Sequence, residues 1–334
     1  MPATSTALQP RRTTLPVARP SIALALGGGG ARGLAHILML EVFDELGLRP
    51  KIIAGTSIGA IFGAAYASGL SAKLIRAHAE EALGQRFDIF RQLISSRAEP
   101  VLKILNVLPV RSALLKPELV LDFFLPSKVA QDFSDLEIPL KVVATDFYAR
   151  EQVVIESGPL RSAIAASIAL PALFAPLIAG DRVMMDGGLV NPLPFDLLLG
   201  EADVTVAIDV SGASTSHGKR LQPSAFNALI ASSQILQRSI VREKLKAQQP
   251  DIYVDVGVDE FNILGFHRFR EILAAAQPAK DQLRRQLDRV LSSQTVDTQA
   301  VESHPVAAIP AEPPKPPRRR GFARLRRLGR RRSR

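Results

Sequence analysis

Short, uninterrupted runs of apolar residues alternate along the chain with longer stretches in which apolar residues recur at helical spacing. The short runs are typical of strands buried on both faces of a sheet, and the longer stretches are typical of amphipathic helices. Strands are predicted at 22–26, 51–54, 140–145, 152–156, 182–184, 204–209 and 252–254. Helices are predicted at 34–46 and 60–68, over much of 71–125 and 225–248, and near 267–276 and 279–292. This alternation predicts an α/β layer fold with a largely parallel sheet.

The two ends of the chain differ in composition from its body. Residues 1–20 are rich in Thr, Pro, Ala and Arg without periodicity, which predicts a flexible segment. A folded domain is predicted over 21–291, and its motifs all lie in a core at 22–200. A Pro-rich linker is predicted over 292–317, and an Arg-rich basic tail follows over 318–334.

The net charge of the 334-residue chain is +10, and it comes entirely from the C-terminal end. Residues 311–334 contain Lys315 and ten arginines against one acidic residue, Glu312, while the rest of the chain has 31 basic and 31 acidic residues. The predicted domain is therefore electrically neutral. The chain has no cysteine, which excludes a disulfide framework, thiolate metal sites and a cysteine nucleophile.

Two uncharged runs, 52–72 and 162–180, are long enough to raise the question of a membrane span. The first is rich in small residues, the second contains Pro171 and Pro176, and both lack the density of Leu, Ile and Phe that favours insertion. The apolar run 22–26 is too short for the core of a signal peptide. We therefore expect a cytoplasmic protein that associates with a membrane, if at all, peripherally at its inner face.

The first motif is the glycine-rich sequence GGGGARG at 27–33, between a predicted strand and a predicted helix. Consecutive glycines leave backbone amides uncovered beside a helix N-terminus, which favours binding of a negative charge. The spacing of Gly28, Gly30 and Gly33 also fits a dinucleotide fingerprint. That fingerprint needs an acidic residue about 20 positions further on, where this chain has Leu48. The interpretation as a nucleotide site is therefore not favoured.

The second motif, GTSIG, contains Gly55, Ser57 and Gly59 and also lies between a predicted strand and a predicted helix. A nucleophilic serine on a sharp strand-to-helix turn needs small neighbours on either side, which this spacing supplies. A serine that merely caps a helix beside a glycine produces the same string. The two turns together would place amide donors and a serine at the same edge of the sheet.

A nucleophilic serine needs a base. Asp186 follows the predicted strand 182–184 and precedes Gly187 and Gly188, so its side chain can face a cleft and accept the serine proton directly. Asp146 and Asp209 also end predicted strands, where a structural capping role is expected.

The five histidines are at positions 36, 78, 217, 267 and 304. An esterase triad in the order Ser, Asp, His could use Ser57, Asp186 and either His217 or His267, and this alternative stays open. His36 and His267 fall in predicted helices, where a structural role is expected.

The motifs occur in an order that characterises a known family. The motif residues are Gly28, Gly29, Gly30, Arg32 and Gly33, then Gly55, Ser57 and Gly59, then Asp186, Gly187 and Gly188. With the block 166–176 and the pairs 145–146 and 191–192, they resemble the signatures of patatin-like phospholipases, in particular their compact bacterial, NTE-type members. The resemblance covers roughly residues 21–280. It implies a three-layer α/β/α fold with a mainly parallel central sheet.

The resemblance also implies a Ser-Asp dyad, in which Ser57 is the nucleophile and Asp186 is the proton acceptor. The oxyanion hole that it implies consists of Gly28, Gly29, Gly30 and Arg32. The implied reaction is hydrolysis of carboxylic esters of phospholipids or lysophospholipids in lipid catabolism, through an acyl-enzyme. Neither a cofactor nor a metal is expected.

Three apolar residues of the basic tail, Phe322, Leu325 and Leu328, recur every three positions among the arginines. Such a segment can lie on an anionic membrane surface, although nucleic acid would attract the same charges. We therefore expect a lipid ester as substrate and an anionic membrane as partner. A non-enzymatic adaptor, whose tail targets a membrane or nucleic acid and whose body binds an acyl ligand, remains an alternative.

Overall fold

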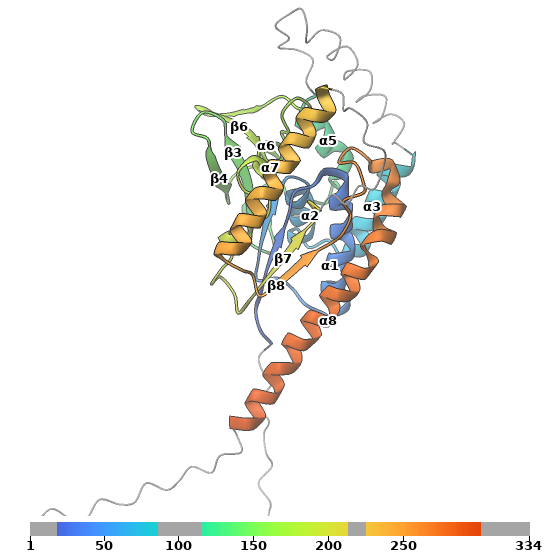
Figure 1. Ribbon diagram of the computed structural model, residues 1–334, viewed down its shortest axis with the longest axis vertical. Coiled ribbons are helices and arrows are strands. Elements are labelled where there is room, and N and C mark those ends of the chain that lie inside the picture. The colour runs from blue at the N-terminus through green and yellow to red at the C-terminus, as the bar shows by residue number, and fades with distance from the viewer. Residues whose placement is uncertain (1–18, 86–114, 213–224, 302–334) are drawn as a thin grey trace, which may run out of the picture.

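The structure, a computed structural model of the chain, describes residues 19–85, 115–212 and 225–301. Within these residues an eight-stranded sheet forms the centre of the molecule, and helices cover both of its faces (Figure 1). The strands are β1 (Ile22–Leu26), β2 (Ile52–Thr56), β3 (Leu140–Asp146), β4 (Glu151–Ile155), β5 (Leu177–Ala179), β6 (Arg182–Asp186), β7 (Val204–Asp209) and β8 (Ile252–Asp255). The helices are α1 (His36–Glu45), α2 (Ile58–Ala67), α3 (Ala72–Gln85), α5 (Pro117–Phe124), α6 (Leu160–Ser167), α7 (Ala225–Ala247) and α8 (Phe269–Val301).

The sheet is parallel in its middle and antiparallel on one side. Its order is β5-β6-β3-β2-β1-β7-β8, and the neighbouring pairs from β3 to β8 all run parallel. β6 runs antiparallel to β3 and β5, and β4 pairs antiparallel with β3 off the main path. The mainly parallel central sheet is therefore confirmed. The parallel strands all end at one edge, which carries both of the predicted functional turns.

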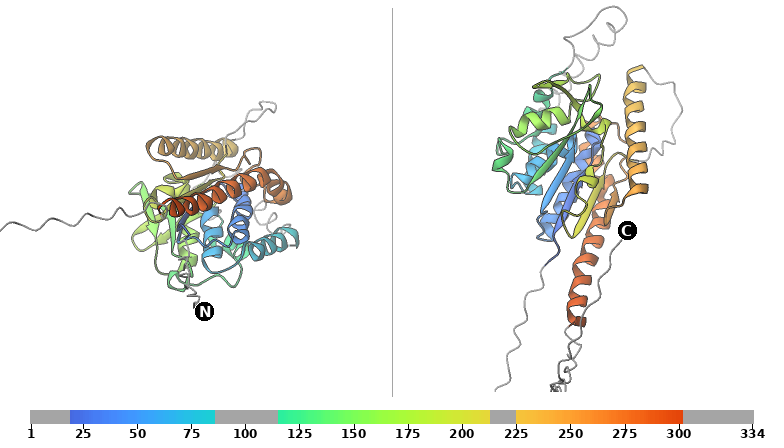
Figure 2. Two further views of the ribbon diagram at one scale, coloured as in Figure 1. Left: turned by 90° about the horizontal axis from the view of Figure 1, so that it is seen from below. Right: turned by 90° about the vertical axis from the view of Figure 1, so that its left-hand side faces the viewer.

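The alternation of residue size along β1 explains the layers. Its large side chains, Ile22, Leu24 and Leu26, belong to the main core, which they share with α1, α2, α3 and α8. Its two alanines, Ala23 and Ala25, face the opposite side, in a smaller cluster that contains Phe195 and, from α7, Val241. Successive residues of a strand point to opposite faces, so β1 contributes to both cores. Figure 2 shows α7 on one face of the sheet and α8 with the other helices on the opposite face.

The C-terminal helix is longer than the sequence pattern predicts. The predicted helices 267–276 and 279–292 form one helix, α8, which runs through Pro278 and ends at Val301. One buried stripe continues across the proline and consists of Ile272, Ala276, Ala279, Leu283 and Leu287. Burial of this stripe outweighs the hydrogen bond that the proline cannot donate. In the structure α8 therefore includes residues 292–301, which the sequence pattern assigned to the start of a linker.

The two uncharged runs form ordinary elements of the fold. The run 52–72 contains β2 and α2, and the run 162–180 contains most of α6 and all of β5. Within the described residues, no helix combines the length and the apolar character needed to cross a bilayer.

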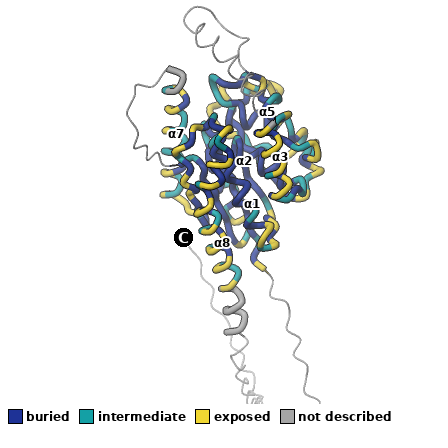
Figure 3. The backbone as a smooth tube through the Cα atoms, turned by 90° about the vertical axis from the view of Figure 1, so that its right-hand side faces the viewer, coloured by how far each residue is buried: buried dark blue, intermediate teal, exposed yellow. Residues whose placement is uncertain are grey.

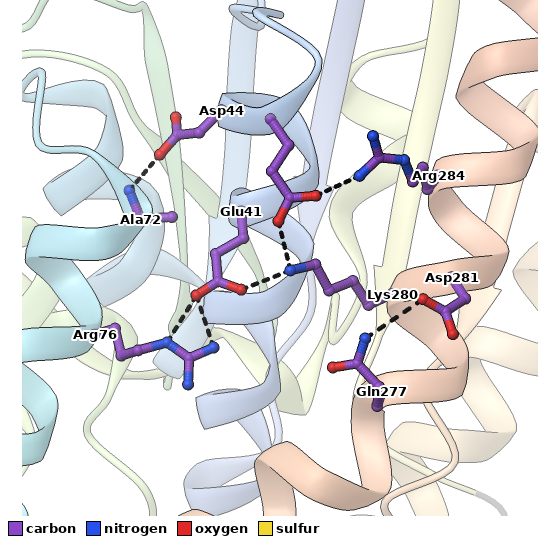
Figure 4. Close-up of polar contacts among 9 residues, drawn as sticks. Glu41, Asp44, Ala72, Arg76, Gln277, Lys280, Asp281 and Arg284 are labelled. Carbon is purple, nitrogen blue, oxygen red and sulfur yellow. Dashed lines mark hydrogen bonds and ion pairs between the residues drawn. The ribbon is translucent and has the colours of Figure 1, made fainter.

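Ion pairs attach α8 to α1 on the outer side of the main core (Figure 4). The Nζ atom of Lys280 lies 2.8 Å from Oε2 of Glu41 and 2.6 Å from Oε1 of Glu45. Arg284 contacts the other oxygen of Glu45 at 2.6 Å, and Arg76 of α3 contacts Glu41 at 2.6 Å. Lys280 is the central cation of this network, and its side chain is only 15% exposed.

We expect Lys280→Met to lower the free energy of unfolding by about 1–2 kcal/mol. The substitution keeps the apolar stem but leaves Glu41 and Glu45, which face each other across one helical turn, without their shared cation. Urea unfolding at low and high salt measures the loss. The control is Lys246→Met, whose ion pair with Glu243 is exposed on both sides and should contribute much less to stability. Equal losses in the two variants would contradict the assignment.

Candidate active site

Ser57 stands between β2 and α2 in a strained backbone conformation. Its φ of 54° and ψ of −122° lie in a region that residues with a side chain rarely adopt. Its amide N–H donates to Oγ of Ser167 at 2.8 Å, and the Ser167 hydroxyl donates to the carbonyl of Val143 at 2.6 Å. The Ser57 side chain makes no capping hydrogen bond to α2. The helix-capping interpretation of this serine is therefore wrong, and its hydroxyl points elsewhere.

That hydroxyl donates a hydrogen bond to Asp186. Oγ of Ser57 lies 2.7 Å from Oδ2 of Asp186, and Oδ1 of the same carboxylate accepts the amide N–H of Gly188 at 2.7 Å. The backbone carbonyl of Asp186 accepts the hydroxyl of Thr145 at 2.8 Å. Both carboxylate oxygens are thus occupied, and the side chain is held in one orientation.

Burial tunes the carboxylate of Asp186. The residue is 3% exposed, and its desolvation raises the pKa to about 6, against the opposing effect of the hydrogen bonds from Ser57 and Gly188. A raised pKa makes an ionised carboxylate a better proton acceptor near neutral pH. The carboxylate is therefore ionised at neutral pH and is basic enough to take a proton from the serine.

The glycine-rich turn lies beside Ser57, since a Cβ atom added to Gly28 would be 3.4 Å from Cβ of Ser57. Gly30 has a φ of +57°, and an added Cβ would lie 2.4 Å from the carbonyl oxygen of Ile263, so only glycine fits there. The remaining motif glycines also lie in close contacts, where an added Cβ would approach a neighbouring atom to less than 3.0 Å: Gly29, Gly33, Gly55, Gly59, Gly187 and Gly188.

The amides of this turn divide into engaged and available donors. The N–H of Gly28 donates to the carbonyl of Pro192 at 2.9 Å, and that of Arg32 donates to the carbonyl of Gly29 at 3.3 Å. Gly29 caps the short 3-10 helix Gly30–Ala35 and Gly30 begins it, so their amides have no intrahelical acceptor. Within the described residues, neither amide hydrogen-bonds to another backbone carbonyl. Of the four residues expected in the oxyanion hole, Gly28 and Arg32 thus have amides that are engaged by backbone carbonyls, and Gly29 and Gly30 have amides that are available.

The Arg32 side chain has a different task from the one expected. Its guanidinium donates to three backbone carbonyls, those of Phe261 at 2.7 Å, Ser211 at 2.6 Å and Asp259 at 3.1 Å, and the residue is 8% exposed. These carbonyls follow β7 and β8, so Arg32 ties two loops to the glycine-rich turn. The sequence motif marks Arg32, but the loops that it binds are more than 170 positions away and could not be inferred.

His36 forms a hydrogen bond with the start of the glycine-rich turn. The residue is fully buried, and its Nε2 atom lies 2.9 Å from the carbonyl oxygen of Gly27. Desolvation lowers the pKa of its imidazole to about 4, so the ring is neutral at physiological pH, and Nε2 carries the proton because a carbonyl can only accept. Position 36 was expected to be structural, and this contact shows what it holds.

The triad alternative receives no support from the described residues. His267 is exposed, in the short 3-10 helix Phe266–Arg268, and no histidine lines the pocket around Ser57 in this part of the chain. His217 lies outside the described residues. The direct partner of the Ser57 hydroxyl is Asp186.

Ser57 and Asp186 open into an apolar pocket of about 920 Å³, counting its open mouth. Its wall includes six large apolar side chains, those of Ile61, Val120, Phe124, Leu173, Phe174 and Phe266. Four residues of α7 complete it on the other side: Ile230, Ser233, Gln234 and Gln237. A pocket with an apolar wall of this kind suits an aliphatic chain.

A parallel α/β sheet that presents a strained serine and a buried aspartate at one edge defines the class of α/β proteins with a nucleophile elbow. The family model described as patatin-like phospholipase matches residues 24–199 of the chain. This match covers more than half of the chain, which therefore belongs to the patatin-like phospholipase family.

Two curated relatives show the range of similarity. An uncharacterized NTE family protein of Mycobacterium tuberculosis is 33% identical over 222 residues, which cover 65% of this chain and 58% of that protein. Patatin-like phospholipase domain-containing protein 6 of Mus musculus is 31% identical over 278 residues, covering 75% of this chain and 20% of that protein. The chain thus spans only part of the length of both relatives. The crystal structure of VipD from Legionella pneumophila superposes with a TM-score of 0.43 at 16% identity, over 81% of this chain and 67% of that one.

Proposed function

We propose that this protein is a serine lipid acyl hydrolase that cleaves carboxylic esters of phospholipids or lysophospholipids. The observation that carries the proposal is the 2.7 Å hydrogen bond from the Ser57 hydroxyl to Asp186, at the opening of an apolar pocket. The strained turn, the buried base and the available amides form a complete set for acyl transfer. Family membership supports the same conclusion.

In the first half of the reaction, Oγ of Ser57 attacks the ester carbonyl while Asp186 accepts the hydroxyl proton. The carbonyl oxygen becomes negative and is stabilised by the amides of Gly29 and Gly30. When the tetrahedral intermediate collapses, protonated Asp186 gives its proton to the departing alcohol, and the acyl group remains on Ser57. In the second half, Asp186 takes a proton from water while the water oxygen attacks the acyl-enzyme. The second tetrahedral intermediate then collapses as Asp186 returns this proton to Oγ of Ser57, and the fatty acid is released.

The pocket supports a long acyl chain as the group that is transferred. Its apolar wall can take an aliphatic chain out of water, and each buried methylene contributes about 0.8 kcal/mol. The ester carbonyl then lies at the polar end of the pocket, beside Ser57 and Gly29.

The proposal is tested by fatty-acid release from vesicles of phosphatidylcholine, phosphatidylglycerol and lysophosphatidylcholine with a chelator present. We expect release from at least one lipid and, with an alkyl fluorophosphonate, one covalent adduct located on Ser57 by mass spectrometry. Absence of both release and adduct, with vesicle binding intact, would favour the non-enzymatic adaptor. An adduct on another serine would overturn the assigned nucleophile.

We expect kcat/KM to rise as the pH increases through about 6 and to be constant above it. Asp186 accepts a proton only when ionised, and burial raises the pKa of its carboxyl to about 6. The measurement is a pH profile on a soluble short-chain ester, with circular dichroism at each pH to exclude unfolding. Activity that is independent of pH between 5 and 7 would contradict the assignment of Asp186 as base.

The basic tail is proposed to draw the protein to anionic membranes at the inner face. It lies outside the described residues, and the proposal rests on its ten arginines. Each arginine near such a surface contributes on the order of 1 kcal/mol at low salt. Truncation after Ala311 should weaken binding to phosphatidylglycerol vesicles and leave hydrolysis of a soluble ester unchanged. Unchanged vesicle binding, or preferential binding of nucleic acid by the full chain, would overturn this role.

A further inference from the structure

Among the described residues, α7 covers its face of the sheet together with the short 3-10 helix Pro194–Leu197, and it runs along the side of the molecule (Figure 3). The inner side of α7 walls the pocket with Ile230 and three polar residues. The C-terminal half is anchored, because Val241 is buried and Lys244 donates to Oδ1 of Asn191 at 2.5 Å and to the carbonyl of Leu193 at 2.9 Å. The helix is thus fixed at one end and forms part of the active-site pocket along its inner side.

The outer side of α7 exposes large apolar side chains to solvent. Leu229, Ile235 and Leu236 are 53%, 67% and 64% exposed. They are three of the seven large apolar side chains that the described residues expose this strongly. Their spacing places them on one side of the helix over two turns. Packing within the described part of the chain does not account for this face.

The polar residues on the same face are satisfied within the helix. The hydroxyl of Ser232 donates to the carbonyl of Ala228 at 2.8 Å, and that of Ser239 donates to the carbonyl of Ile235 at 3.0 Å. A hydroxyl with an internal acceptor loses less on leaving water than one without a partner. From 228 to 237 the helix has no charged residue, so this face can enter an apolar phase at low cost.

Charged residues begin where the apolar face ends. Arg238, Arg242 and Lys246 follow along the helix, against one acidic residue, Glu243. Arg242 and Lys246 both contact Glu243, at 3.4 Å and 3.0 Å, and their side chains are 68% and 65% exposed. Cations beside an apolar face match the phosphate groups that lie beside the hydrocarbon of a bilayer.

We propose that the outer face of α7, defined by Leu229, Ile235 and Leu236, inserts into the surface of a lipid bilayer. A bilayer is the occupant that fits, because the opposite side of the same helix walls the pocket that would receive an acyl chain. Contact at this helix would hold the pocket beside the lipid from which its substrate comes. The purpose of the contact rests on the proposed function, but the contact itself can be measured without turnover.

The chain has no tryptophan, so one introduced tryptophan is a specific reporter. Ile235→Trp places it on the proposed face, and Leu74→Trp places it on α3 at a leucine that is 52% exposed. Both are prepared with Ser57→Ala to prevent hydrolysis. With phosphatidylcholine vesicles in 1 M salt, where the Debye length is about 3 Å, the basic tail contributes little. We expect a blue shift and protection from acrylamide quenching at position 235 and not at 74. No shift at 235, or equal shifts at both positions, would overturn the proposal.

The effect on turnover separates docking from chemistry. The triple variant Leu229→Gln, Ile235→Gln, Leu236→Gln keeps residues that favour helix and removes the apolar face. We expect binding to phosphatidylcholine vesicles to weaken at least about tenfold, equivalent to about 1.4 kcal/mol. Hydrolysis of vesicle lipid should fall with it, while hydrolysis of a soluble short-chain ester stays within twofold. The matched control, Leu74→Gln, should change none of these. Loss of soluble-ester hydrolysis together with vesicle hydrolysis would mean that the face supports the pocket and not the membrane.

Failure of this proposal and failure of the proposed function give different results. A tryptophan shift at 235, together with no hydrolysis of any ester by the wild-type protein, would support the membrane-binding face and contradict the proposed hydrolase activity. Hydrolysis of vesicle lipid that is unchanged by the triple substitution would support the proposed hydrolase activity and contradict the membrane-binding face. The other candidate occupant of this face is a second copy of the chain, which sedimentation without vesicles tests. If the wild type formed an oligomer and the triple variant did not, the face would be assigned to that contact.

Discussion

Replacement of Asp186 by asparagine is expected to lower kcat for ester hydrolysis by about 10³-fold or more. An amide cannot take the proton from Ser57, and general-base catalysis of this kind contributes about 10²- to 10⁴-fold. The geometry of the site can survive the change. The amide oxygen can still accept from Gly188, and the amide nitrogen can donate to Oγ of Ser57 in place of the present bond. Single-turnover kinetics on a soluble ester, beside Ser57→Ala, measures the loss.

The same substitution should not destabilise the protein, which distinguishes loss of a base from loss of the fold. Burial raises the pKa of Asp186 from 3.8 to about 6, so the folded state holds this proton more tightly than the unfolded state. Stability from this group is therefore fully present below about pH 4 and is lost as the pH rises through about 6. At 1.36 kcal/mol per pKa unit, the ionised carboxylate costs on the order of 3 kcal/mol. We expect Asp186→Asn to be at least as stable as the wild type at pH 8 in urea unfolding.

Two outcomes would contradict this account. A variant with most of its activity would show that Asp186 is not the base. A variant that is inactive but several kcal/mol less stable would mean that the carboxylate is a structural group. His267→Ala serves as a control for the triad alternative and should be nearly as active as the wild type, since His267 is exposed and does not line the pocket.

Local patterns in the sequence were sufficient to predict the chemistry-bearing part of the fold. Buried strands leading into small-residue turns predicted β1 and β2, and the carboxyl ends of parallel neighbours meet at one edge. The proximity of Ser57 to the glycine-rich turn follows from that rule. The proximity of Ser57 to Asp186 does not, because β6 runs antiparallel to β3 and enters the site from the other direction. The position of Asp186 before two glycines made it a candidate base, and the motif resemblance implied its pairing with Ser57.

The supporting contacts could not be predicted because they join residues far apart in the sequence. Ser167 holds the amide of Ser57 from 110 positions away, and Arg32 reaches Phe261 across 229 positions. Motif matching drew attention to both residues without indicating what they bind. The course of α8 through Pro278 was missed for a different reason, since a proline is a reliable local signal for a helix end and only the continuous buried stripe overrides it.

The second large effect, on stability and on activity, is expected from a substitution of Gly59 in the first turn of α2. An added Cβ would lie 2.1 Å from the carbonyl oxygen of Leu26 and 2.8 Å from that of Gly27, both of them backbone atoms that cannot rotate away. The contact places α2 directly against the end of β1, where the glycine-rich turn begins. We therefore expect Gly59→Ala to lower the free energy of unfolding by about 3 kcal/mol or more. Activity should fall as well, because α2 would have to move Ser57 away from Gly29 and Gly30.

Helix propensity alone predicts the opposite sign, which makes Gly59→Ala a sharp test. Alanine is better than glycine inside a helix by about 1 kcal/mol, and Gly59 has no positive φ that would oppose the change. Gly84 in α3 is the matched control, because an added Cβ there meets nothing within 4 Å. Gly84→Ala should therefore raise stability by about 0.5–1 kcal/mol in urea unfolding. If Gly59→Ala were also stabilising, the close approach of α2 to β1 would be wrong, and with it the placement of the nucleophile beside the amide donors.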